Sequence, residues 1–173
     1  MQAHDDAPGE QAGGPGWLPW VLAAATLGAV LGLDQLTKQL VQDSIARGDE
    51  RSFLPGVELV NTRNRGVAFG FLPGSQTLVT ILIGVALLVL LVYFARHSRR
   101  ALMWLPTGML IGGALGNILD RVRHGSVTDF VKLPLGWPPF NLADAAITLG
   151  ILALLAIAEG SSSRHRRDGH ARR

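Results

Sequence analysis

The sequence predicts an all-α integral membrane protein with four transmembrane helices. Hydrophobic residues make up 48% of its 173 residues, and the mean hydropathy of +0.28 is high for a soluble domain of this length. Four apolar runs are interpreted as spanning helices. Basic residues cluster in short flanks beside these runs, as expected for segments at a membrane surface.

The predicted helices follow these apolar runs in order. They cover Trp17 to about Leu33, Thr77 to Ala95, Trp104 to about Leu119, and Leu142 to Ala158. No Lys or Arg precedes the first run, so we expect a retained helix and not a signal peptide. The polar composition of residues 1–16 predicts a disordered N-terminal tail, and that of residues 160–173 a basic, disordered C-terminal tail. The membrane domain is therefore expected over residues 17–159.

Two connecting segments are expected outside the membrane on the same side. The first, at about 52–72, predicts a small β-element with strands at 57–60 and 67–71 and a turn at 64–66. Because such a hairpin is marginally stable alone, it must pack on the helices. The second segment, at about 121–140, is expected to be a loop.

Composition excludes several kinds of chemistry. The chain has no cysteine, which removes disulfides, thiolate metal sites and a cysteine nucleophile. No histidine or serine lies inside an apolar run, which argues against a Ser-His intramembrane hydrolase, and the zinc-protease motif HExxH is missing. The net charge is +3, but the positions of the basic residues favour membrane lipid over nucleic acid as a partner.

Glycines define one face of the third predicted helix. Gly108, Gly112, Gly116 and Asp120 are each four residues apart and therefore share a face. Small residues at this spacing allow close helix packing in membranes, which points Asp120 into the bundle. Asp120 and Arg121 are adjacent and do not face each other, so each is expected to find a partner elsewhere.

The arginines indicate an orientation. Arg96, Arg99 and Arg100 lie in one five-residue loop, a strong signal for retention in the cytoplasm. With four spans, both termini would lie on that side too. Polar residues then gather at the outer face, where their cost at membrane depth usually marks a functional site. They are Asp34, Lys38, Asn64, Asn117, Asp120, Arg121, Asp129, Asn141 and Asp144.

Carboxylates remain as candidates for catalysis at this site. Two aspartates that share one proton can activate water and protonate a leaving amine. Partial desolvation would raise one pKa and favour the singly protonated pair. Asn141 and Asp144 are three residues apart and share a helix face, so Asn141 can orient the carboxylate or a scissile carbonyl.

Simpler interpretations of single residues stay open. Asp34 and Lys38 have the spacing of a helical ion pair, which could cap the first span and snorkel to water. Asn64 could be only a turn residue. Asp129 could be a solvated loop aspartate, and Asp144 could interact mainly with a helix dipole.

Five motifs between Asp34 and Asp144 occur in the same order as in bacterial lipoprotein signal peptidases, and the chain resembles that family. Val67 is a mild departure, at a position where small residues are common. The motifs are Asp34-Gln35-Leu36-Thr37-Lys38, Asn64-x-Gly66-x-Ala68-Phe69, Gly112-Gly113-Ala114-x-Gly116-Asn117-x-x-Asp120-Arg121, Val127-x-Asp129-Phe130 and Phe140-Asn141-x-Ala143-Asp144.

The resemblance implies an intramembrane aspartic endopeptidase of the bacterial cytoplasmic (inner) membrane. It would remove the signal peptide from diacylglyceryl-modified prolipoproteins, cutting just before the lipidated cysteine. Asp129 and Asp144 match the family's catalytic pair, and no metal or cofactor is implied. Matches to substrate-binding positions are Asn64, Asn117, Arg121 and Asn141, and matches to supporting positions are Asp34, Lys38 and Asp120.

Two other classes of function remain as alternatives. A small transporter or proton-coupled channel would carry polar groups along its whole path, whereas this chain gathers them at one end. A non-catalytic lipid-binding scaffold would need the asparagines and the arginine but would tolerate amide replacement of the aspartates.

Overall fold

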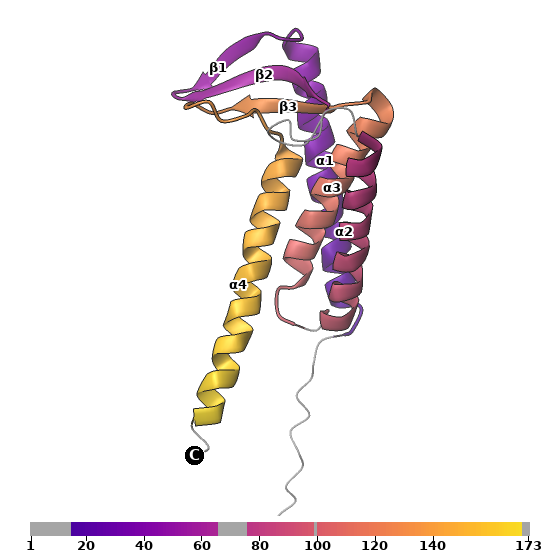
Figure 1. Cartoon of the computed structure of the whole chain (residues 1–173), viewed down its shortest axis with the longest axis vertical. Coiled ribbons are helices and arrows are strands. Elements are labelled where there is room, and N and C mark those ends of the chain that lie inside the picture. The colour runs from indigo at the N-terminus through magenta and orange to yellow at the C-terminus, as the bar shows by residue number, and fades with distance from the viewer. Residues whose placement is uncertain (1–14, 66–75, 99, 171–173) are drawn as a thin grey trace, which may run out of the picture.

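The structure is a computed structural model that describes residues 15–65, 76–98 and 100–170. Long helices run side by side, and a small sheet lies across one end of them (Figure 1). The helices are α1 Leu18–Ser44, α2 Gln76–His97, α3 Trp104–His124 and α4 Leu142–His170. The strands are β1 Glu50–Leu54, β2 Val57–Asn64 and β3 Val127–Lys132.

The helices begin close to the predicted positions, but three of them are longer than expected. The first helix was expected to end at about Leu33, whereas α1 continues to Ser44, because its last turns pack Val41 under the sheet. α3 runs to His124, past the predicted end at about Leu119. α4 stays helical to His170, within the range assigned to the C-terminal tail. The predicted N-terminal tail lies almost entirely outside the described residues.

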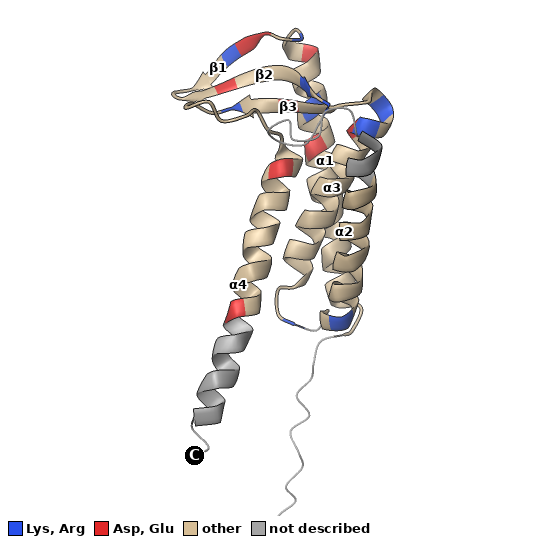
Figure 2. Ribbon diagram, viewed as in Figure 1, with Lys and Arg blue, Asp and Glu red and all other residues tan. Residues whose placement is uncertain are grey.

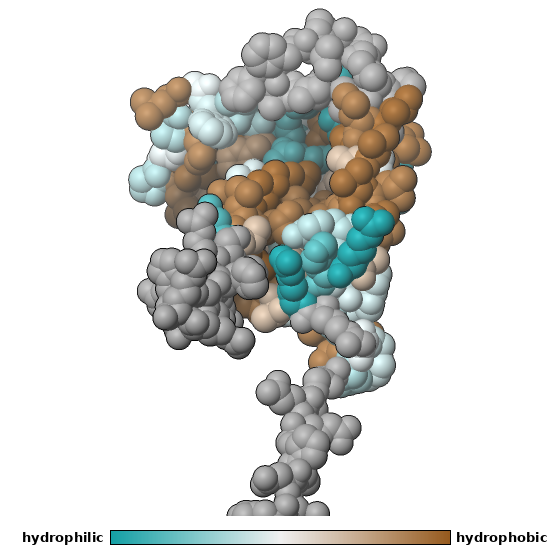
Figure 3. All heavy atoms as spheres, turned by 60° about the horizontal axis from the view of Figure 1, so that its bottom comes forward, coloured by the Kyte–Doolittle hydropathy of each residue, from teal (hydrophilic) through white to brown (hydrophobic). Residues whose placement is uncertain are grey.

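Two helices in the described part of the chain are long and apolar enough to cross a membrane, namely Leu18–Ser44 and Leu142–Glu159. The third apolar segment, Ile81–His97, is shorter. Large hydrophobic side chains lie exposed along α2 and α4, and apolar surface covers much of the bundle in Figure 3. The helical architecture with a small sheet is confirmed, and the crossing of a membrane by all four helices stays a prediction.

The glycine face of α3 packs against α1, as the spacing predicted. A Cβ atom added at Gly108 would lie 2.7 Å from the carbonyl oxygen of Ala23, and one at Gly112 would lie 2.8 Å from that of Leu27. On another face of α3, a Cβ atom at Gly113 would lie 2.6 Å from the carbonyl oxygen of Ala143 in α4. Glycine therefore allows α3 to approach both neighbouring backbones.

The sheet differs from the predicted hairpin. β2 contains the predicted strand 57–60, but its hairpin partner is β1, through a turn at Gly56 with φ of 79°. Asn64 ends β2 and is not part of the predicted turn, because β2 pairs along its length with β3. β3 comes from the segment expected to be a loop. The predicted strand 67–71 lies outside the described residues.

A small apolar cluster fixes the sheet to the helices. Phe130 of β3 packs with Val41 and Ile45 at the end of α1, and Leu59 of β2 joins them. Neighbouring side chains on a strand point to opposite faces. The anchoring of Phe130 therefore fixes the direction of the preceding side chain, Asp129.

Candidate active site

The predicted polar residues meet where the sheet joins the helix ends. Acidic and basic residues concentrate at this end of the bundle, above a long uncharged stretch (Figure 2). Among the nine predicted residues, Arg121, Asn64 and Asp144 are partly buried. The other six are buried: Asp34, Lys38, Asn117, Asp120, Asp129 and Asn141.

Asp144 is held at the start of α4 by reciprocal hydrogen bonds with Asn141. The Asp144 N–H donates to Asn141 Oδ1 at 2.9 Å, and the Asn141 N–H donates to Asp144 Oδ2 at 3.3 Å. This pattern is that of a capping box, with an asparagine and an aspartate in its two positions. Asn117 Nδ2 also donates to Asp144 Oδ1 at 2.8 Å. The Asp144 carboxylate is thus oriented by neutral donors.

Asp129 approaches the same asparagine from the sheet. Asn141 Nδ2 donates to Asp129 Oδ1 at 2.8 Å, and Asn64 Nδ2 donates to Asp129 Oδ2 at 3.1 Å. Asn141 therefore binds both aspartates, through its side-chain amide for Asp129 and its backbone for Asp144. The interpretation of Asp129 as a solvated loop residue is wrong, because it is buried in a strand.

Burial, and after it the charge of the nearby Asp144 carboxylate, raise the pKa of Asp129 to about 6. Hydrogen bonds from Asn64 and Asn141 and the charge of Lys38 act in the opposite direction. A carboxyl group with a pKa near 6 can hold or release a proton close to neutral pH. Two neighbouring aspartates, one of which has its pKa raised in this way, can share one proton.

Lys38 joins the supporting residues. Its Nζ lies 2.8 Å from Asp34 Oδ2 and 3.2 Å from Asp120 Oδ2, and it donates to Asn117 Oδ1 at 3.1 Å. The side chains of Lys38 and Asp34 are 2% and 0% exposed. The interpretation as a pair that snorkels to water is therefore wrong. Asp120 also has the separate partner that the sequence predicted.

The two carboxylates bound to Lys38 also fix the segments that carry the aspartate pair. Asp34 Oδ1 accepts the N–H of Ala143, in the first turn of α4, at 2.9 Å. Asp120 Oδ2 accepts the N–H of Thr128, in β3, at 2.9 Å. The cluster around Lys38 therefore binds the backbone at the residue before Asp144 and at the residue before Asp129.

Arg121 takes a different place from the other predicted residues. Its guanidinium donates to the carbonyl oxygen of Asn117, one turn earlier in α3, at 3.3 Å. It is partly exposed beside the site. Its assignment as a substrate-binding residue stays a prediction.

Sequence analysis missed two further contributors. Gln35 Nε2 donates to Asp120 Oδ1 at 3.2 Å and to the carbonyl oxygen of Gly116 at 3.3 Å. Its place inside the first motif was a signal that could have identified it. The hydroxyl of Thr128 accepts from Arg63 at 2.9 Å and from Gln42 at 3.2 Å. No local signal marked Thr128, because its contacts depend on strand pairing.

No group of three His, Cys, Asp or Glu side chains that could hold a metal ion occurs in the part of the chain that the structure describes. The site offers carboxylates, amides, the Lys38 ammonium group and the Arg121 guanidinium. Its arrangement is suited to proton transfer and to hydrogen bonding of a peptide group.

Comparison with known proteins identifies the family. A family model described as signal peptidase (SPase) II matches residues 26–158, which include every predicted site residue. The chain belongs to the signal peptidase II family. It is therefore a peptidase, and it resembles solved membrane enzymes.

Relatives match most of this signal peptidase II chain. A protein of Azoarcus sp. strain BH72 named lipoprotein signal peptidase is 40% identical over 158 residues, which cover 86% of each chain. One of Halothermothrix orenii with the same name is 38% identical over 73% of this chain and 87% of its own. A solved bacterial membrane enzyme superposes with a TM-score of 0.73 at 30% identity, covering 84% of this chain and 90% of that one. The chain is thus an integral membrane protein.

Proposed function

We propose that this signal peptidase II is an aspartic endopeptidase that removes the signal peptide from diacylglyceryl-modified prolipoproteins. It cuts just before the lipidated cysteine, and its peptidase domain covers residues 17–159. One observation carries the proposal: Asn141 hydrogen-bonds both Asp129 and Asp144 at a buried site. The names of the relatives, lipoprotein signal peptidase, support the choice of substrate.

The reaction needs one ionised and one protonated aspartate. The ionised carboxylate takes a proton from water as the water oxygen bonds to the scissile carbonyl carbon. The protonated carboxyl group donates to the nitrogen of the cysteine, the C–N bond breaks, and the amine leaves. The two carboxylates titrate as a pair, and the raised pKa of Asp129, about 6, brings the uptake and release of their shared proton close to neutral pH.

The amides and the arginine are assigned to the substrate. Asn64, Asn117 and Asn141 already donate to the aspartates. They therefore keep both carboxylates in one geometry while the peptide enters, which is the benefit of preorganisation. Arg121, partly exposed beside them, is positioned to bind a carbonyl group of the substrate or a lipid headgroup.

The proposed topology places all four helices across the bacterial cytoplasmic membrane. Both termini and the Arg96–Arg100 loop lie in the cytoplasm, and the sheet and the site lie at the outer face. The polar site lies at the end of the bundle away from that loop (Figure 2). A cysteine introduced at Ser52 should react with an impermeant reagent outside the cell, and one at Ser98 should not. Labelling at Ser98 alone would reverse the orientation.

The test of function is cleavage by purified protein. Incubation with a diacylated prolipoprotein should release the signal peptide and a product that begins at the modified cysteine, both identified by mass. The same substrate without the diacylglyceryl group is the control for substrate choice, and Asp129→Asn is the control for mechanism. Turnover by Asp129→Asn in protein free of endogenous enzyme would contradict the aspartic mechanism. Binding of the prolipoprotein without any cleavage by the unmodified protein would favour the scaffold alternative.

A further inference from the structure

The far end of the sheet carries a group of exposed apolar side chains, here called the apolar tip. Phe53 and Leu54, next to the hairpin turn, are 62% and 55% exposed. Leu135 and Trp137, in the segment between β3 and α4, are 103% and 58% exposed. Leu54, Leu135 and Trp137 border a groove of about 570 Å³ between the hairpin and that segment.

This exposure is costly in water. Each large apolar side chain left in water forgoes the favourable free energy of burial. Leu135 also has a φ of 66°, a left-handed conformation that is disfavoured for residues other than glycine. The chain thus holds a leucine outward in a strained backbone, an arrangement that indicates a contact beyond the protein itself.

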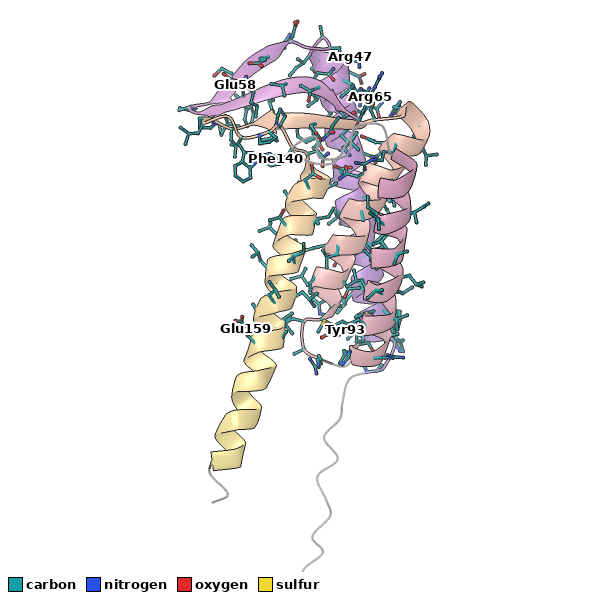
Figure 4. The ribbon with its side chains drawn as sticks, in the orientation of Figure 1. Arg47, Glu58, Arg65, Tyr93, Phe140 and Glu159 are labelled. Carbon is teal, nitrogen blue, oxygen red and sulfur yellow. The ribbon has the colours of Figure 1, made fainter. Side chains whose placement is uncertain are left out.

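The apolar tip adjoins the apolar surface of α4. Trp137 is five residues before Leu142, where α4 begins. From there, exposed Leu149, Leu152 and Leu155 continue along the helix. Figure 1 shows the hairpin extending sideways past the first turn of α4, and Figure 4 shows Phe140 beneath the sheet, beside that turn. The tip therefore lies beside the sheet end of a candidate membrane span.

The tryptophans occupy two levels of the molecule. Trp17 and Trp20 lie at the start of α1, and Trp104 begins α3, at the end of the bundle away from the sheet. Trp137 lies at the sheet end. The span Leu142–Glu159 has 18 residues, or about 27 Å at the helical rise, close to the thickness of a hydrocarbon core. Because Trp prefers the membrane interface, these two levels fit the two interfaces of one bilayer.

We propose that the apolar tip inserts into the lipid headgroup and acyl boundary of the leaflet that surrounds the start of α4. The occupant of this surface is the bilayer itself. The contact holds the free end of the sheet at a fixed depth, and with it β3, the strand that carries Asp129. At the polar edge of the groove, Lys132 lies 3.0 Å from Glu58, an ion pair suited to the headgroup region.

The test uses Trp137 as a depth reporter. Trp17→Phe, Trp20→Phe and Trp104→Phe together leave it as the single tryptophan, in the full chain reconstituted into nanodiscs. Lipids brominated high on the acyl chain should quench its fluorescence more strongly than lipids brominated near the chain end, and aqueous iodide should quench it weakly. Strong quenching by iodide with none by either brominated lipid would overturn the proposal.

A matched pair of variants separates insertion from a general effect on the fold. Leu135→Asp should move Trp137 toward water, with loss of lipid quenching and a gain in iodide quenching. Leu102→Asp, at another exposed leucine with a positive φ of 61°, lies at the opposite end and should leave Trp137 unchanged. Equal responses to the two variants would contradict a local contact. If the triple variant does not fold, the difference in quenching between the unmodified protein and Trp137→Phe reports the depth of Trp137 instead.

Discussion

Two pairs of aspartates lie at the same end of the helix bundle, in different electrostatic surroundings. Asp34 and Asp120 share the ammonium group of Lys38, at 2.8 and 3.2 Å. Asp129 and Asp144 receive their hydrogen bonds from Asn64, Asn117 and Asn141, which carry no charge. Each pair is therefore well hydrogen-bonded, but among the residues that the structure describes only the first pair has a cation within ion-pair distance. The charges of Lys38 and Arg121 act on the second pair from farther away.

This difference separates a structural role from a catalytic one. The carboxylates of Asp34 and Asp120 are engaged by a buried cation and by backbone N–H groups of α4 and β3. A buried carboxylate that is bound by neutral amides and faces a second carboxylate is held near its point of titration, as the pKa of Asp129 at about 6 illustrates. The first pair can position backbone, while the second can move protons.

The largest effect on stability is expected from Lys38→Met. It would leave Asp34 and Asp120 buried without their cation, and breaking a buried ion pair by removing one partner costs about 3–5 kcal/mol. Thermal unfolding in detergent should show a large loss. Lys132→Met is the matched control, because Lys132 forms an exposed ion pair with Glu50 and should change stability little. Equal stability of the two variants would show that the cluster around Lys38 is not structural.

Adding Asp120→Asn to Lys38→Met sharpens this test. The double variant has one buried carboxylate fewer and should recover part of the lost stability. The Asp120→Asn change alone should keep partial cleavage, because Asp120 contacts Thr128 and not the proposed reacting atoms. A double variant less stable than Lys38→Met would mean that charge compensation is not the cause.

A smaller effect is expected from Gly116→Ala. An added Cβ atom would lie 2.5 Å from Asp34 Oδ2, so it must displace the carboxylate that holds α4. Overpacking of this kind costs about 1–3 kcal/mol, and cleavage should fall with it. Gly84→Ala in α2 is the control, since nothing lies within 4 Å of its added Cβ atom. The same loss in both variants would point to a general effect of replacing helical glycine.

Asn64→Leu should change the pH dependence of cleavage. Its hydrogen bond to the Asp129 carboxylate favours the ionised form and lowers the pKa of Asp129. Removing that donor should raise this pKa above its present value of about 6, so Asp129 keeps its proton to higher pH. The alkaline limb of the kcat/KM profile should therefore move to higher pH.

Thr62→Val is the control for this shift. The Thr62 hydroxyl donates to the backbone carbonyl of Asp129 and not to its carboxylate. Its loss should leave the limb in place. If the alkaline limb stays fixed in Asn64→Leu, or moves equally in Thr62→Val, the pH dependence does not arise from the Asp129 carboxyl group.

The parts of the fold that depend on helical periodicity were predictable from the sequence. The spacing of Gly108, Gly112 and Gly116 predicted a close approach of helices, which the structure shows against α1. The spacing of Asn141 and Asp144 predicted that they share a face, and they form a capping box. Residues three or four apart on one helix share a face, so their relative position follows from their spacing in the sequence.

Contacts between distant segments were not predictable in this way. Asn64 was assigned to a turn because its local sequence favours one, but pairing with β3 places it in a strand opposite Val127. The buried position of Thr128 depends on the same pairing. The direction of Asp129 follows from the packing of Phe130 against α1, which no local pattern encodes.

The most direct test compares the same amide substitution at the four aspartates, Asp34, Asp120, Asp129 and Asp144, in one detergent at neutral pH. Cleavage of a diacylated prolipoprotein and the Tm would be measured for each purified variant. Asp129→Asn and Asp144→Asn should abolish cleavage and keep the Tm near that of the unmodified protein, because neither carboxylate forms an ion pair with a described residue that the substitution would break. Asp34→Asn and Asp120→Asn should lower the Tm, and Asp120→Asn should retain partial cleavage. Measurable turnover by Asp129→Asn or Asp144→Asn, with cleavage lost only where the Tm falls, would contradict the division into a structural pair and a catalytic pair.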